Sequence, residues 1–166
     1  MLTRLAKTAL VAALGFFLFI VAFNNVTDYS SNYGFVFHVL AMDTTFPGNA
    51  AMWRAIHSAP IYHAFYASII LWEAVACGLL FAGAWKLWQS RAAGAAAFNR
   101  AKHLAVAGLA LNLLQWLVAF ITVGGEWFFM WQSKSWNGQD AAARMFMIAG
   151  VILIFLNTRD EEIESA

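Results

Sequence analysis

A single acidic residue stands in the middle of a long apolar segment. Glu73 is the only charged residue between Ile61 and Trp85. An acidic group at the centre of a membrane helix costs roughly 2.5–3.5 kcal/mol on insertion scales, so it is expected to face the bundle interior and to find a polar partner. Such a group can bind a proton or a cation. The alternative is a structural role, in which a protonated or hydrogen-bonded Glu73 joins two helices.

Three polar residues are candidate partners of Glu73. Asn112 and Gln115 are three residues apart in a later apolar segment, so they share a helix face, and we expect them near the depth of Glu73. Tyr66 precedes Glu73 by seven residues and lies on its face of the same helix. The sequence therefore predicts an intramembrane polar site made of Glu73, Asn112, Gln115 and Tyr66, without a second acidic residue.

Histidines gather in the stretch between the first two apolar segments. Imidazole and carboxylate groups bind zinc and copper, so this stretch could contribute to a metal site. The candidate ligands are three histidines, an aspartate and a glutamate from a later loop: His38, His57, His63, Asp43 and Glu126. The alternative is that these histidines are hydrogen-bonded within a folded loop, because their spacing forms no compact ligand motif.

Two other cofactors can be weighed from the sequence. A bis-histidine haem is not expected, because His63 opens one predicted membrane helix on the outer side and His103 opens another on the inner side. Tryptophans crowd the loops that follow the first and third apolar segments. They predict either the aromatic belt of a membrane interface or a quinone or lipid pocket: Trp53, Trp127, Trp131 and Trp136.

The composition is that of an integral membrane protein. Of 166 residues, 62% are hydrophobic and only 11% are charged, whereas soluble domains carry roughly 25% charged residues. A net charge of +1 without a basic stripe argues against nucleic acid. Cys77 is the only cysteine, so no intramolecular disulfide is expected. No nucleophile elbow, phosphate loop, zinc-protease or dinucleotide motif occurs, and an enzymatic activity has little support.

Hydropathy predicts an all-α membrane protein with four transmembrane helices in one domain, 1–166. The first apolar run is about 28 Å long as a helix, close to the ~30 Å hydrocarbon core. The four predicted spans are 5–23, 61–88, 103–123 and 140–156. We expect the connecting segments 24–60 and 124–139 to form a helical periplasmic cap, with a cytoplasmic loop 89–102 and a cytoplasmic tail 157–166. Within the cap, 35–42 is too short to span and either lies at the interface or folds against the bundle.

Positive charges predict the orientation. The amino-terminal flank and residues 86–102 hold six Lys or Arg residues, whereas the two opposite loops and the start of the fourth span hold three. Cytoplasmic loops carry the excess of Lys and Arg, so both termini are expected in the cytoplasm.

The two predicted cap segments carry a resemblance. The strings NNVTDYSSNYGFVFHVLAMDTTFPGNAAMWRAI and GGEWFFMWQSKSWNG resemble a family of predicted small integral membrane proteins from Gram-negative bacteria that carry a domain of unknown function. The resemblance covers nearly the whole chain. It implies four transmembrane helices in the inner membrane, and it supplies neither an activity nor catalytic residues.

Three functional hypotheses follow. The first is a non-enzymatic accessory or assembly subunit of a larger membrane complex, or a homo-oligomer, whose partners are membrane lipids and another membrane protein or a second copy of itself. The second is a small transporter or channel subunit with a midplane acidic site at Glu73. The third is a protein that binds a metal, a quinone or a lipid at the cap.

Overall fold

The computed structural model describes residues 1–162, and this part of the chain is helical and contains no strand. Its longer helices are α1 (Leu2–Thr27), α2 (Tyr29–Ala41), α3 (Ala59–Gln89), α4 (Ala95–Ala101), α5 (His103–Leu114), the π-helix η2 (Gln115–Trp127) and α6 (Gln139–Asn157). Two short 3-10 helices, η1 (Met52–Arg54) and η3 (Met130–Gln132), lie in the connections.

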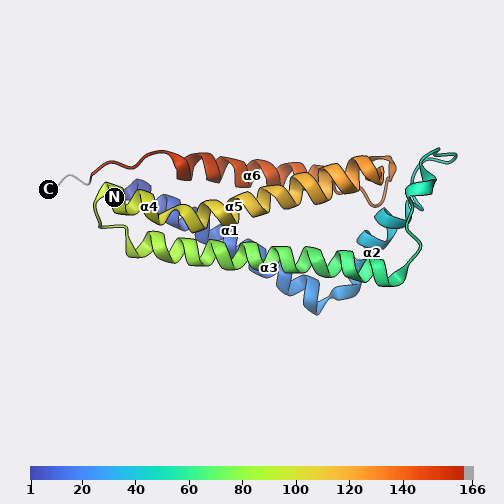
Figure 1. Cartoon of the computed structure of the whole chain (residues 1–166), viewed down its shortest axis with the longest axis horizontal. Helices are drawn as coiled ribbons and strands as arrows, with labels where there is room; N and C mark the ends of the chain where they lie inside the picture. Colours follow the sequence, from blue (N-terminus) through green and yellow to red (C-terminus); the bar gives the residue numbers. More distant parts are fainter. Residues whose placement is uncertain (163–166) are drawn as a thin grey trace.

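Four helices in the described residues are long and apolar enough to cross a membrane. They are α1, α3, the run Ala95–Trp127 that contains α4, α5 and η2, and α6. The prediction of an all-α protein with four such helices is therefore confirmed. Figure 1 shows them as one elongated bundle, with the start of α1 and the carboxyl end of α6 at the same end. We call this the inner end, and we call the opposite end, which holds residues 42–58 and 128–138, the outer end.

The helices extend beyond the predicted spans. The first ends at Thr27 rather than at residue 23, and the third run begins at Ala95 and continues to Trp127 rather than covering 103–123. An apolar run measures only the part of a helix suited to hydrocarbon, whereas the helix itself continues into flanking polar residues. The predicted third span ends at residue 123, but the π-helix passes through Gly124 and Gly125.

The segment 24–60 is divided between the bundle and the outer end. Asp28, with φ −120° and ψ 61°, breaks the helix between α1 and α2. Helix α2 then folds against the bundle, where Val36 and Leu40 pack in one apolar cluster with Tyr66 of α3 and Met130 of η3. Residues 35–42 therefore fold against the bundle, which was the second of the two alternatives expected for them.

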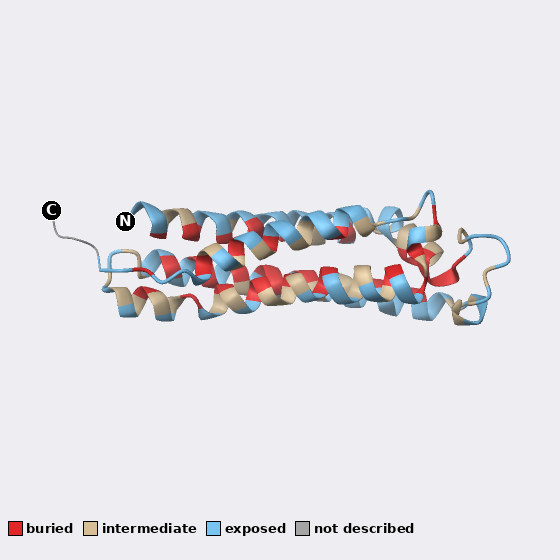
Figure 2. Ribbon diagram, turned by 90° about the horizontal axis from the view of Figure 1, so that it is seen from above, coloured by how far each residue is buried: buried red, intermediate tan, exposed pale blue. Residues whose placement is uncertain are grey.

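Two apolar clusters fill the bundle, one at each end, and Glu73 lies between them on α3. The inner cluster contains Val11, Leu80 and Leu109, and the outer cluster contains Val39 and Tyr62. The outward faces of the helices are exposed and apolar (Figure 2). Such faces suit a lipid environment, because acyl chains need no polar partners.

Glycines bring α3 and α5 into close contact in the inner half. A Cβ atom on Gly83 would lie 2.5 Å from the backbone nitrogen of Ala105, and one on Gly108 would lie 2.9 Å from Leu80 Cγ. Small residues at helix interfaces allow this backbone approach in membrane bundles. The inner half is therefore tightly packed, without a polar side chain between Glu73 and the inner end on the buried face of α3.

Candidate functional site

Glu73 lies in the interior of the bundle and accepts hydrogen bonds from two helices. Its side chain is buried, and the residue is only 3% exposed. Asn25 Nδ2, near the end of α1, donates to Glu73 Oε2 at 2.7 Å. Gln115 Nε2, at the start of η2, donates to Glu73 Oε1 at 3.3 Å. The carboxyl group therefore links the first, second and third apolar helices.

Asn25 is a central member of this site that the sequence reasoning missed. Its side-chain Oδ1 accepts a hydrogen bond from Asn32 Nδ2 of α2 at 2.6 Å, and its backbone oxygen accepts one from the Tyr66 hydroxyl at 3.2 Å. A signal was present in the sequence, because Asn25 follows Leu18 by seven residues and continues the buried stripe of α1. Placing the end of the first helix at residue 23 concealed it.

The other predicted members occupy different roles. Tyr66 reaches the backbone of Asn25 rather than Glu73. Asn112 is fully buried, yet neither atom of its amide has a hydrogen-bond partner in the described residues. Gln115 Oε1 and Trp116 Nε1 are likewise buried without a partner there. Buried polar atoms are usually paired, so these four atoms mark a region of the third apolar run whose packing leaves polar groups unsatisfied.

A cavity of about 230 Å³ lies beside Glu73. Its polar lining comes from α1, α2 and α3: Asn25, Asn32, Tyr66 and Glu73. Its aromatic lining comes from α2 and η2: Phe35, Trp116 and Phe120. Asn32 is exposed, so the polar lining continues from the buried carboxyl group to the molecular surface.

A second, apolar cavity of similar volume lies between α2, α3 and η2. The two cavities share four lining residues, Phe35, Val36, Ile69 and Phe120. These side chains therefore form a common wall between a polar and an apolar compartment.

The residues expected to bind a metal are distributed over separate contacts. His38 Nδ1 pairs with Asp43 Oδ2 at 2.8 Å, and its ring stacks on Trp136 with centroids 4.5 Å apart. His63 Nδ1 instead bonds the Tyr29 hydroxyl at 2.8 Å. Within residues 1–162 no group of three or more His, Cys, Asp or Glu residues lies close enough to hold a metal ion, so the structure does not assemble His57 and Glu126 with the others.

The outer-end tryptophans surround an arginine. Trp53 is 74% exposed, and its ring lies 6.0 Å from that of Trp127. The Arg54 guanidinium lies over both rings, 5.3 Å and 4.5 Å from their centroids. Trp131 contacts Phe46 edge to face at 5.8 Å. These aromatic side chains give the outer end a partly exposed apolar surface.

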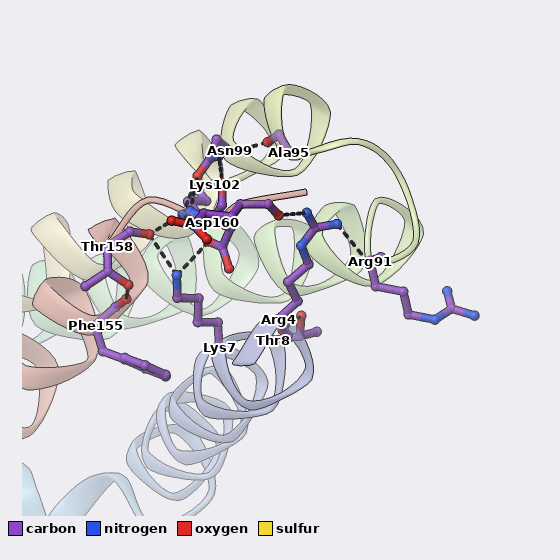
Figure 3. A network of polar contacts seen from close by, with 11 residues as sticks. Arg4, Lys7, Thr8, Arg91, Ala95, Asn99, Lys102, Phe155, Thr158 and Asp160 are labelled. Atoms are coloured by element: carbon purple, nitrogen blue, oxygen red, sulfur yellow. Dashed lines mark hydrogen bonds and ion pairs between the residues drawn. The ribbon is translucent and has the colours of Figure 1, made fainter. Parts of the chain in front are cut away.

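The inner end holds a charged network that the sequence reasoning also missed. Lys7 Nζ and Lys102 Nζ each lie 2.6 Å from Asp160 Oδ2, and both donate to the backbone oxygen of Thr158 (Figure 3). Arg4 donates to the backbone oxygens of Arg91, Ala93 and Glu161. These contacts connect the start of α1 with the loop after α3 and with residues 158–161.

The two lysines of this network lower the pKa of the Asp160 carboxyl group. Burial alone would raise the pKa of its carboxyl group, but the hydrogen bonds and charges of Lys102 and Lys7 outweigh burial and hold that pKa below its ordinary value. The first residues of the predicted tail 157–166 are therefore held against the bundle, and residues 163–166 lie outside the described residues.

A family model described as "Predicted small integral membrane protein (DUF2165)" matches residues 3–159. The chain belongs to this family. Membership agrees with the resemblance carried by the two loop segments, and with four helices apolar enough to span a membrane. The protein is thus a predicted small integral membrane protein of the DUF2165 family. No curated protein and no solved structure matches the chain significantly.

Proposed function

We propose that this DUF2165 protein is a small transporter or channel-type subunit in which Glu73 binds a proton or a cation. The single observation that carries the proposal is the buried carboxyl group of Glu73 beside a cavity. Within residues 1–162, no Lys, Arg or His forms an ion pair with this carboxyl group. A carboxylate inside a membrane is costly unless something neutralises it. Two amide donors stabilise its charge but do not cancel it.

The break between α1 and α2 supports the same proposal. Transporters often bind ions where a membrane helix is interrupted, because the freed carbonyl oxygens and the negative end of the helix dipole favour cations. Here the carboxyl end of α1 supplies the backbone oxygen of Asn25, and the side chain of the same residue bonds Glu73. The negative end of a helix and an acidic residue therefore meet.

Proton flux into liposomes tests the proposal. Glu73→Gln keeps the shape of the side chain and one of its two acceptor oxygens while removing its titratable group, so flux is expected to fall by about tenfold or more. Glu126→Gln is the matched control, because Glu126 is an exposed acid at the outer end. Equal flux through wild type and Glu73→Gln, with both variants folded, would refute a transport role for Glu73.

We further propose the bacterial inner membrane as the location, with both termini in the cytoplasm. The charge distribution supports this orientation. Arg4, Lys7, Arg91, Arg100 and Lys102 lie at the inner end with both termini, where an excess of positive charge favours the cytoplasmic side. Reporter fusions at residue 1 and at residues 47–48 should report opposite sides of the membrane.

A second candidate function is that of an accessory subunit, bound to another membrane protein or to a second copy. The exposed aromatic surface around Trp53 and Trp127 supports it, because aromatic residues are enriched at protein interfaces. Contact with membrane lipids explains the same surface. Native mass spectrometry of the protein extracted gently from its own membrane discriminates between them: a defined larger assembly supports the subunit role, and a lone chain with bound lipid argues against it.

A further inference from the structure

The charge of Glu73 sets the first requirement for anything that occupies its cavity. The side chains that bond Glu73 are the amides of Asn25 and Gln115, and the polar side chains that share its cavity are those of Asn25, Asn32 and Tyr66. None of these is positive at neutral pH. Neutrality therefore requires either a proton on the carboxyl group or a cation in the cavity. A cation that enters the cavity displaces the proton from Glu73, because either one alone neutralises the carboxylate. The cation and the proton therefore compete for one site.

The aromatic walls set the second requirement. Phe35 and Phe120 stack with centroids 6.2 Å apart, and Trp116 lies 4.7 Å from Phe120. All three line the cavity that holds Glu73. Aromatic faces attract ammonium groups, most strongly where water is excluded. A carboxylate opposite aromatic rings is therefore suited to an ammonium ion that carries an apolar substituent.

The remaining oxygen atoms disfavour an inorganic ion. Hard cations such as Ca²⁺ and Mg²⁺ need six or more oxygen ligands. Here the only lining residues with side-chain oxygens are Asn25, Asn32, Tyr66 and Glu73, and Asn25 Oδ1 already accepts from Asn32. The cavity of about 230 Å³ is also far larger than a bare ion. Because the cavity contains one carboxylate, its occupant is expected to carry one positive charge.

We propose that the cavity beside Glu73 binds a small monovalent organic cation, a protonated amine or a quaternary ammonium, in exchange for one proton. The ammonium group lies at the Glu73 carboxylate and its apolar part lies against Phe35, Trp116 and Phe120. The displaced proton leaves to water, so the charge of the site does not change. This inference rests on the proposed function, and it names the substrate class of the same site.

The test measures binding rather than transport. Benzylammonium is titrated calorimetrically into the full-length protein in lipid nanodiscs, in weak buffer, with the released protons recorded. We expect saturable binding and up to one proton released per cation. Benzyl alcohol, which has the same ring without the charge, should bind at least about tenfold more weakly, and sodium at equal concentration should not compete.

Three variants locate the site. Glu73→Gln should abolish binding and proton release, whereas the exposed control Glu126→Gln should change neither. Phe120→Leu retains an apolar side chain but removes an aromatic face, so it should weaken binding by about three- to tenfold. If Glu73→Gln does not fold, Phe120→Leu decides the test. Loss of the Phe120 ring should weaken benzylammonium binding without changing the charge of the protein.

Equal affinity for benzyl alcohol, binding without proton release, or unchanged affinity in Phe120→Leu would each overturn the inference. The outcome is separable from that of the flux experiment. Binding without flux leaves the cation site intact and refutes transport, while proton flux without benzylammonium binding refutes the substrate class alone.

Discussion

Two buried polar regions of this bundle differ in how completely their groups are paired. At the inner end, two lysines converge on Asp160, the surrounding carbonyl oxygens accept the remaining hydrogens, and no buried side-chain nitrogen or oxygen of this network lacks a partner within residues 1–162. Around Glu73, the acid has no cationic partner and four nearby buried atoms are unpaired. Complete pairing is what stability requires, and a buried acid without a cationic partner beside a cavity leaves room for a ligand. This contrast separates the structural region from the functional candidate.

Breaking the inner network should have the largest effect. Asp160→Asn removes the carboxylate that Lys7 and Lys102 share, and the side chains of these lysines are only 0% and 7% exposed. Leaving buried charges unpaired typically costs about 3–5 kcal/mol, so the free energy of unfolding should fall by that order. Denaturant titration in mixed micelles measures it, with the exposed Asp140→Asn as the control. A loss below about 1 kcal/mol would show that the network is not structural.

Acid should weaken the same region. The pKa of Asp160 is lower in the folded protein than in the unfolded chain, where Asp titrates near about 3.9. Its contribution to stability is therefore complete above about pH 4 and is lost as the pH falls through the folded-state pKa. Unfolding titrations across this window should show a steeper acid loss for wild type than for Asp160→Asn. Parallel pH profiles would contradict the assignment.

Replacing the unpaired amide of Asn112 by an apolar side chain should raise the free energy of unfolding rather than lower it. Asn112 is buried with neither amide atom bonded in the described residues, so Asn112→Leu removes a desolvation cost. The free energy of unfolding should rise by about 1 kcal/mol. A thermal melt against wild type checks it. A marked loss of stability would mean that Asn112 is as fully engaged as Asp160.

The smallest change in stability is expected at Glu73 itself. Glu73→Gln preserves the volume of the side chain. Its carbonyl oxygen can accept from Asn25 Nδ2, and its NH2 group can donate to Gln115 Oε1, which has no partner in the described residues, so the free energy of unfolding should change by less than about 1 kcal/mol near neutral pH. The same melt measures it. A loss as large as that of Asp160→Asn would place Glu73 among the structural residues and remove the contrast.

Hydropathy predicted the four long helices because membrane spans are local in sequence. It did not predict where they end, since α4 (Ala95–Ala101) is helical although it contains Asn99 and Arg100. The contact of Lys7 with Asp160 joins residues 153 positions apart, and no local pattern encodes such pairing. The proximity of Gln115 to Glu73 was predictable from shared depth. The role of Asn25 depended on a helix end that hydropathy placed four residues too early.

The histidines illustrate the opposite error. Being close in sequence suggested a common site for His38 and His63. Both belong to helices, yet each is bonded to a different residue, Asp43 for the first and Tyr29 for the second. Sequence proximity is a weak guide to shared geometry when a helix break such as Asp28 reorients the chain between the residues.

The close contact of α3 with α5 at Gly83 and Gly108 has an electrical consequence. Between Glu73 and Leu87 the buried face of α3 is apolar over about 21 Å, roughly two thirds of a ~30 Å hydrocarbon core. A densely packed apolar layer has a low dielectric constant, so a large share of the membrane voltage falls across it. If Glu73 carries a proton or a cation as proposed, the charge would cross this layer to reach the inner end. Passage through the inner half would then be the voltage-dependent step, worth up to about 2.3 kcal/mol per charge at 100 mV.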